Sequence, residues 1–190
     1  MRKIILLALI FFTSFTAFGQ DFSNKGKDFY LCFPNHVPSG ANLATLSIFI
    51  TSDRASSGTI TMPNGAFSAT FSIAAFGLQE IVIPWNSSIH ISNPESSNET
   101  ITQILTKSIR IKVNPGQPAV VAYAQQWAGA RSAATLLLPV NVLGRKYFAI
   151  SSNQTNSSAG SNLARSQFQI IATKPNTVVE ITPVKNGVKQ

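Results

Sequence analysis

Hydrophobic and polar residues alternate with a period of two along much of this chain. The clearest case runs from residue 67 to 73, where Phe67, Ala69, Phe71 and Ile73 alternate with serine and threonine. This pattern is typical of a β-strand with one face on a core and the other in solvent. Comparable segments predict strands at 29–33, 46–51, 59–62, 67–73, 78–83, 89–91, 108–113, 119–124, 135–140, 147–150, 167–173 and 177–181.

The fold class follows from these segments. No stretch after residue 19 shows helical periodicity over three turns, so the sequence predicts an all-β protein. About eight or nine short strands in a unit of ~120 residues are typical of an antiparallel β-sandwich. A β-propeller of four-stranded blades is the alternative that also fits the number of strands.

The chain also repeats part of its own pattern. The segment G-K-D-F-Y-L-C-F from Gly26 returns as G-R-K-Y-F-A-I-S from Gly144, 118 residues later. The segments 50–63 and 171–183 are similar in the same way, at offsets of 121 residues for their first positions and 120 for their last. We therefore predict a tandem repeat with a first unit at 20–143 and the start of a second at 144–190. Because the second unit lacks most of its strands, the chain is expected to be part of a longer protein.

The N-terminus has the features of a secretory signal peptide. Arg2 and Lys3 precede an apolar run at 4–12, and small residues then lead to a cleavage site after Gly19. A membrane anchor would need roughly 20 consecutive apolar residues, and this run is too short. Residues 1–19 are therefore predicted to be removed, leaving a secreted or extracellular protein that is either free or attached to a cell surface and does not insert into a membrane.

Charge and cysteine content narrow the choice of partners. The whole chain carries a net charge of +8, which falls to +6 when Arg2 and Lys3 leave with the leader. The remaining cations are scattered and no aromatic residues interleave with them, so a solvated basic surface is favoured and no nucleic acid partner is predicted. The single cysteine, Cys32, cannot form a disulfide within the chain, and its place in an apolar strand predicts a buried, unreactive thiol.

No arrangement of residues indicates catalysis, a metal site or a cofactor. Glycoside hydrolysis needs two carboxyl groups facing each other across a cleft, whereas Glu80 and Glu180 fall on the polar sides of predicted strands. The histidines, His36 and His90, have no second ligand at the spacing of a zinc site. Neither a G-x-S-x-G motif nor a phosphate-binding glycine loop is present. We therefore predict that the protein is not an enzyme, although a triad assembled only in space stays open at this stage.

Aromatic residues are the better candidates for a binding site. Trp85 follows the proline that ends a predicted strand, and Trp127 lies just beyond the apolar segment 119–124. Exposed at the ends of a sandwich, either tryptophan could stack on a sugar or anchor a protein partner. Tyr30 and Tyr147 continue strand patterns and are expected to pack in the core.

With its strands placed, the chain resembles the N-terminal domain of IgGFc-binding proteins. The opening G-K-D-F and the joint L-P-V-x-x-L-G-x-x-Y are the most specific matches. The matching segments begin at Gly26, Ser47, Ser108, Ala119, Leu136 and Ile170.

The resemblance implies an adhesive or ligand-binding module at a cell surface, in bacteria often at the head of a long multidomain protein. It supplies no catalytic residues, and it does not imply that every member binds immunoglobulin. The predicted function is a non-catalytic module that recognises an extracellular protein or glycan. A catalytic or accessory domain of a carbohydrate-active enzyme and a passive spacer of a surface protein are the alternatives.

Overall fold

The structure is a computed structural model that describes residues 23–34, 44–85, 105–129, 131–150, 168–182, 184–185 and 188–189. The predicted signal peptide and the predicted strand at 89–91 lie outside the described residues. The described strands are β1 (Asp28–Leu31), β2 (Thr45–Thr51), β3 (Ser56–Thr61), β4 (Ser68–Ile73), β5 (Leu78–Ile83), β6 (Ile109–Val113), β7 (Val121–Ala128), β8 (Arg131–Leu136), β9 (Val184–Lys185) and β10 (Val188–Lys189), with one short 3-10 turn, η2 (Val140–Val142).

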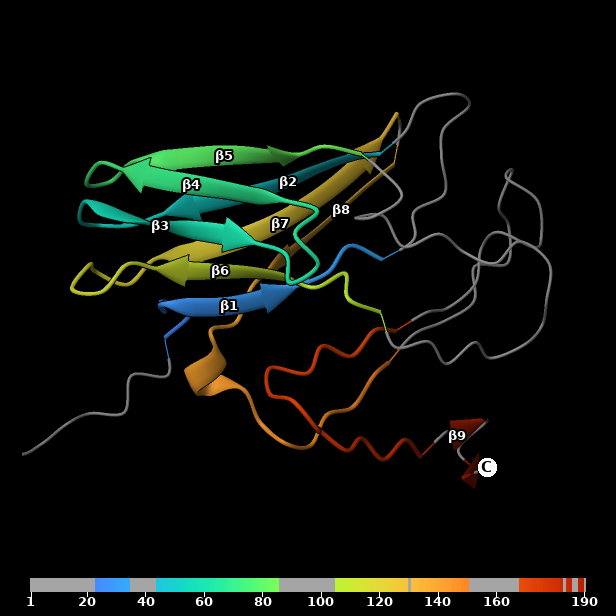
Figure 1. The fold of residues 1–190 in the computed structure, drawn as a ribbon. Coiled ribbons are helices and arrows are strands. Elements are labelled where there is room, and N and C mark those ends of the chain that lie inside the picture. The colour runs from blue at the N-terminus through green and yellow to red at the C-terminus, as the bar shows by residue number, and fades with distance from the viewer. Residues whose placement is uncertain are drawn as a thin grey trace, which may run out of the picture.

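Two four-stranded antiparallel sheets pack face to face, which confirms the predicted all-β sandwich (Figure 1). The first sheet has the strand order β1-β6-β3-β4, and the second has the order β5-β2-β7-β8. In the second sheet the central strand β2 pairs on both sides, so that Phe49 lies opposite Glu80 of β5 and Tyr123 of β7.

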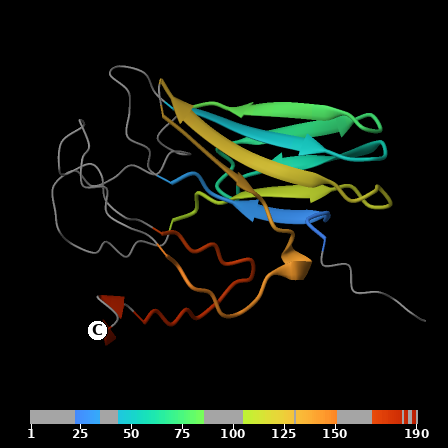
Figure 2. The same ribbon diagram turned by 180° about the vertical axis from the view of Figure 1, so that it is seen from behind.

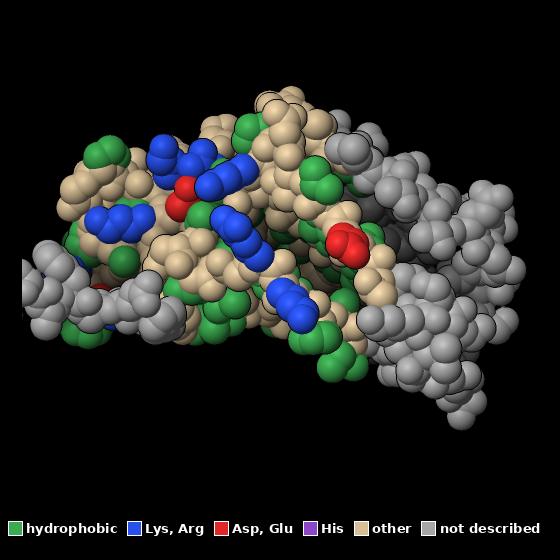
Figure 3. Space-filling model, turned by 90° about the horizontal axis from the view of Figure 1, so that it is seen from below, with side chains coloured by type: hydrophobic (Ala, Val, Ile, Leu, Met, Phe, Trp, Pro, Cys, Tyr) green, Lys and Arg blue, Asp and Glu red, His purple; other side chains and the backbone are tan. Residues whose placement is uncertain are grey.

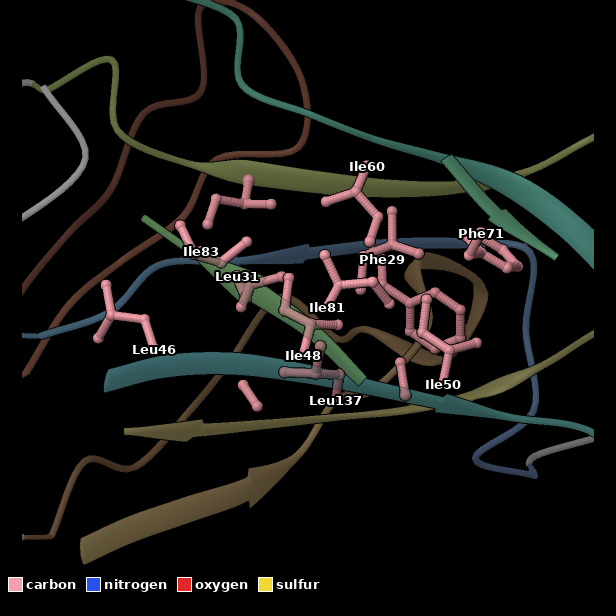
Figure 4. Packing of buried hydrophobic residues seen from close by; sticks show 14 of the residues in the cluster. Phe29, Leu31, Leu46, Ile48, Ile50, Ile60, Phe71, Ile81, Ile83 and Leu137 are labelled. Carbon is pink, nitrogen blue, oxygen red and sulfur yellow. The ribbon is translucent and has the colours of Figure 1, made fainter. Parts of the chain in front are cut away.

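The alternating sequence pattern explains why these segments form strands. In β4 the side chains of Phe71 and Ile73 are buried, whereas Ser68, Thr70 and Ser72 face outward. Branched and aromatic residues from both sheets meet between the layers (Figure 4). The fully buried members include Phe29, Leu46, Ile48, Ile50, Ile60, Phe71, Ile83, Ile109 and Ile111. Each such side chain contributes about 1.5–3 kcal/mol relative to exposure, so this shared core holds the two sheets together.

A short backbone bridge also joins the sheets where β1 and β7 begin. Gly26 N–H donates to the Val120 carbonyl at 2.9 Å, and Val120 N–H donates back to Gly26 at 2.9 Å. Gly26 has no room for a side chain, because an added Cβ would collide with the ring of Pro139. The glycine of the G-K-D-F opening is therefore required by close packing against the L-P-V joint.

The structure corrects the predicted strand at 135–140. The strand β8 begins earlier, at Arg131, and ends at Leu136, because the chain turns away from the sheet at buried Pro139 into η2. Proline has no N–H to continue a ladder, which accounts for the end of the strand. The preceding strand β7 is longer than the predicted segment and runs to Ala128, where it forms a hairpin with β8.

Three predicted strands do not form. Residues 147–150, 168–173 and 177–181 form no strand and pair with no neighbour within the part of the chain that the structure describes, and they lie outside the sandwich in Figures 1 and 2. Their large apolar side chains are exposed, to 84% at Phe148 and 94% at Ile150. Tyr147, which was expected in the core, is 66% exposed. Tyr30 is also not a core residue, because it is only half-buried on the outer face of β1.

Candidate binding surface

The outer face of the second sheet is an apolar surface of the sandwich that has no layer packed on it among the described residues. Outward positions of an antiparallel sheet exposed on one side are usually polar. Here they include large apolar side chains from all four strands. These are Leu78 and Val82 of β5, Phe49 of β2, Tyr123 and Trp127 of β7, and Leu136 of β8. We call these six residues the apolar face.

The register of the strands brings the members of the apolar face together. Tyr123 lies between Phe49 and Leu136, directly opposite both. Trp127 is four residues further along β7, which at the rise of a strand places it about 13 Å from Tyr123. The two side chains are 40% and 46% exposed. The apolar face thus presents two partly exposed aromatic rings, and the hydrophobic core lies on the opposite side of the same sheet.

Only one charged residue lies among these outward positions of β5, β2, β7 and β8. Glu80 belongs to β5, and the buried hydroxyl of Ser47 donates to its Oε1 at 2.7 Å. This hydrogen bond occupies Oε1 of Glu80. The other carboxylate oxygen can accept a hydrogen bond from a group on a binding partner. The apolar face therefore combines apolar area with a single negative charge.

The two tryptophans predicted as ligand-binding residues lie in different environments. Trp127 is on the apolar face, next to the last residue of β7 and opposite Thr45, the first residue of β2. Trp85 directly follows β5 and is partly buried against the hydrophobic core. The structure does not bring them together into one site.

Sequence reasoning included Tyr123 among the aromatic candidates for a binding surface but missed Phe49 and the aliphatic members of the apolar face. The segment 119–124 is apolar on both sides, which predicts a strand in the middle of a sheet or packed on both sides, and β7 does lie between β2 and β8 in the second sheet. In the structure the inner side, with Ala122 and Ala124, is buried, whereas Tyr123 faces outward. An apolar strand pattern predicts contact on both faces but does not say whether the second contact lies within the chain.

A second feature is a groove of about 490 Å³ at the beginning of β1. Its walls include Lys25, Gly26, Lys27 and Asp28 on one side and Val140 and Asn141 of η2 on the other. Lys25 Nζ lies 2.9 Å from the carboxylate of Asp53, and this hydrogen bond lowers the pKa of Asp53. Lys and Arg side chains gather on the side of the molecule shown in Figure 3, so this part of the surface is basic.

The described acids do not form a catalytic pair. Asp28 lies on the outer face of the first sheet and is hydrogen-bonded by Arg110, whereas Glu80 lies on the outer face of the second. Asp53 is paired with Lys25, and Glu180 lies in the extended segment after residue 167. The remaining acids and both histidines are outside the described residues. Within the described ranges no three His, Cys, Asp or Glu side chains are grouped as metal ligands.

Cys32 directly follows β1 and is only partly buried, less than the buried position that the sequence predicted. Its Sγ–H donates to Oε1 of Gln169 at 2.7 Å. Burial raises the pKa of the Cys32 thiol to about 11. The thiol is therefore protonated at neutral pH, which makes it a poor nucleophile.

The comparison with known families agrees with the resemblance that the sequence motifs suggested. The family model described as IgGFc binding protein matches residues 133–190. Residues 133–190 are therefore similar to the IgGFc-binding family. The matched region begins within β8 and includes Pro139, η2 and the extended segments, while the sandwich before it lies outside the match. No curated protein and no solved structure matches the chain significantly.

The part of the chain that the structure describes contains no helix long and apolar enough to cross a membrane.

Proposed function

We propose that this chain is a secreted or cell-surface module that binds an extracellular protein through the apolar face and catalyses no reaction. The observation that carries the proposal is the exposure of Trp127 and Tyr123 on a sheet face that also presents Leu78 and Val82. Soluble proteins seldom expose contiguous apolar surface of this kind unless it meets a partner. Tryptophan and tyrosine are also the residues that most often dominate the binding energy of protein interfaces.

The family name supports a protein rather than another class of ligand. It refers to binding of the Fc part of immunoglobulin G, so an Fc fragment is the first probe to use. The aliphatic members of the face support the same choice, since sugar-binding surfaces pair aromatic rings with polar groups. The basic groove beside β1 is separate from this face and is not needed for the proposal.

The test measures binding of the purified chain to an immunoglobulin Fc fragment and to a glycan array. Trp127→Ala and Tyr123→Ala are each expected to weaken binding by about tenfold or more, as hot-spot residues do. Phe76→Asn is the matched control, because Phe76 is 86% exposed in a turn outside the apolar face and already has a positive φ that asparagine tolerates.

The outcomes separate the candidate functions. Loss of Fc binding in the two face variants, with Phe76→Asn unchanged, supports the proposal. Equal affinity in all variants would show that the apolar face is not the site. Binding to glycans alone, again lost in Trp127→Ala, favours glycan recognition, for which the two exposed rings are the supporting observation. No binding to either class favours a passive spacer.

Export is a separate part of the proposal. It rests on the basic pair, the apolar run and the small residues that precede Gln20. N-terminal sequencing of the protein recovered outside the cell is expected to begin at Gln20. Recovery of a protein that begins at Met1 and stays with the cells would contradict it.

A further inference from the structure

The strand β1 is at the edge of the first sheet and has an open side. Among the described strands β6 is its one neighbour, and none of them pairs with its other side. An open strand edge presents unpaired N–H and C=O groups, which proteins either cover or use to bind another strand. Because β1 belongs to the first sheet, a site on its edge is independent of the apolar face, which belongs to the second.

The register with β6 identifies the backbone groups that face the open side. Val113 N–H donates to the Lys27 carbonyl at 2.8 Å, so these two residues form a hydrogen-bonded pair. Hydrogen-bonded pairs alternate with non-hydrogen-bonded pairs along an antiparallel ladder. Asp28 and Tyr30 are therefore in non-hydrogen-bonded pairs with β6. Their N–H and C=O groups point away from β6, toward the open side.

The chain already pairs with this side of the edge at Gly26. Gly26 exchanges two hydrogen bonds with Val120 in an antiparallel bridge. If the pairing continued, Asp28 would lie opposite Pro118. Proline has no N–H to donate, and the carbonyl of Pro118 accepts a hydrogen bond from the Ser56 hydroxyl at 2.8 Å. The pairing therefore stops after one residue, and the backbone groups of β1 beyond it are left open.

The groove of about 490 Å³ lies along this part of the edge. It is bounded by Val140 and Asn141 of η2, which lies beside the beginning of β1 in Figures 1 and 2. Lys27 lines the groove, is exposed and forms no ion pair within the described ranges. The carboxylate of Asp28 already accepts two hydrogen bonds from Arg110. The groove therefore has a cation available for an acidic group.

We propose that this edge binds an extended segment of another protein that carries a carboxylate side chain. The segment adds to β1 as an antiparallel strand, the orientation of the bridge at Val120 and of every strand pair in the first sheet. Its backbone pairs with Asp28 and Tyr30, and its residue opposite Lys27 is acidic. The residue two positions earlier lies on the same side of the added strand. An apolar residue is favoured there, because Val140 is part of the groove wall.

A second copy of the chain does not match this site as well. A symmetric pairing of two β1 strands that places Asp28 opposite Tyr30 also places Leu31 opposite Lys27. No carboxylate would then meet the lysine. Each copy would also bring its own η2 to the shared edge. Charge complementarity therefore favours an acidic peptide over a second β1.

The test follows individual amide protons of the full chain by NMR. The probe is the capped peptide Ser-Thr-Val-Thr-Glu, whose threonines are placed opposite Tyr30 and Asp28 and whose glutamate is placed opposite Lys27. Exchange of the Asp28 and Tyr30 amides is expected to slow by about tenfold when the peptide concentration is about ten times its Kd. The amide of Phe29, which is paired with β6, is the internal control and should change little.

Matched changes separate backbone pairing from charge. Replacing the peptide's glutamate by glutamine, or Lys27→Gln in the chain, is expected to weaken binding about threefold, as the loss of an exposed ion pair does. Lys112→Gln is the control variant, because Lys112 is opposite Asp28 on β6 and does not line the groove. A peptide methylated on the backbone nitrogens of both threonines is expected to give no protection, because it cannot donate to the edge.

The outcomes are distinct. Protection that needs both the carboxylate and the backbone N–H groups of the peptide supports the proposal. Equal protection by the methylated peptide would show that the groove responds only to charge, and equal protection by the glutamine peptide would show that no carboxylate is recognised. Slow exchange of Asp28 and Tyr30 without peptide would show that the chain itself, or a second copy if light scattering gives a dimer, already covers the edge. Each of these results, or no protection by any peptide, would overturn the proposal.

Discussion

Arg110 and Asp28 join β6 to the edge strand β1 on the outer face of the first sheet. Arg110 Nε donates to Oδ1 of Asp28 at 2.8 Å and Nη2 donates to Oδ2 at 2.6 Å. The guanidinium carbon also lies 5.3 Å from the ring centroid of Tyr30. The hydrogen bonds that Arg110 donates to the Asp28 carboxylate raise the pKa of Arg110 above its ordinary value. A two-point ion pair stacked on a ring fixes the register of β1, which has a strand neighbour on one side only.

Replacing this carboxylate is expected to loosen the edge of the sheet. Asp28→Asn should lower the free energy of unfolding by about 0.5–1 kcal/mol, because both side chains are about one third exposed and water screens the pair. Urea denaturation measures the change, which should shrink in about 1 M NaCl. Lys112→Gln is the control, since Lys112 lies opposite Asp28 in the ladder but is not its bidentate partner. An equal decrease in the free energy of unfolding in the two variants would show that the Asp28–Arg110 ion pair does not itself stabilise the fold.

Gly58 allows β3, β6 and the aromatic ring of β4 to approach one another. A Cβ at this position would meet the Lys112 carbonyl oxygen and would lie 2.5 Å from two ring atoms of Phe71. Gly58→Ala should therefore destabilise the fold by about 2 kcal/mol or more through overpacking. The denaturation midpoint of Gly144→Ala serves for comparison, because nothing lies within 4 Å of a Cβ there. A midpoint for Gly58→Ala as high as that of Gly144→Ala would contradict this packing.

The alternation of apolar residues was sufficient to predict the sandwich and most of its strands. Segments such as 67–73 and 78–83 encode in their own sequence which side faces the core, and the structure confirms the alternation in β4 and β5. The reason is local, because side chains of a strand alternate wherever its partners lie. The order of the strands within a sheet depends on contacts between segments far apart in the sequence. Nothing in the alternation of residues predicted that β6 would lie between β1 and β3.

The same distinction explains what sequence reasoning missed. A strand also needs a neighbour for its backbone groups, and 147–150 has none among the described residues although its pattern resembles that of β1. Tyr123 and Trp127 share one side of β7 because strand side chains alternate with a period of two, but which side of this apolar strand faces the core depends on the packing of the two sheets. The exact end of β8 depended on Pro139 meeting Gly26, a contact between residues far apart in the sequence.

The thiol of Cys32 should make stability fall at alkaline pH. Burial raises its pKa from 9.0 to about 11, so the folded state holds the proton more tightly than the unfolded state. Stability from the neutral thiol is therefore fully present below pH 9.0 and is lost as the pH rises toward about 11. Urea denaturation at several pH values should show a steeper decline across this range for the natural chain than for Cys32→Ala.

Alkylation gives a second measure of the same group. At about pH 8 the thiolate fraction is on the order of a thousandth, so iodoacetamide should react some hundredfold more slowly than with a free cysteine. The rate should rise with pH up to about 11 and return to the ordinary value when the chain is unfolded. Rapid labelling of the folded chain at neutral pH would contradict the shielding of Cys32.

Gln126 is an inward-facing polar residue whose replacement should stabilise the fold. It lies on β7 between Leu46 of β2 and Ala133 of β8, is buried, and its Oε1 has no hydrogen-bond partner among the described residues. An unsatisfied buried acceptor costs about 1–3 kcal/mol, whereas an apolar group of similar shape carries no such cost. Gln126→Leu should therefore raise the free energy of unfolding by about 1 kcal/mol, measured by urea denaturation. Gln126→Glu should lower it at neutral pH and recover on acidification, because a buried carboxylate must give up its charge. Destabilisation by leucine would instead mean that the amide is satisfied in solution, and the lost stability would measure that hydrogen bond.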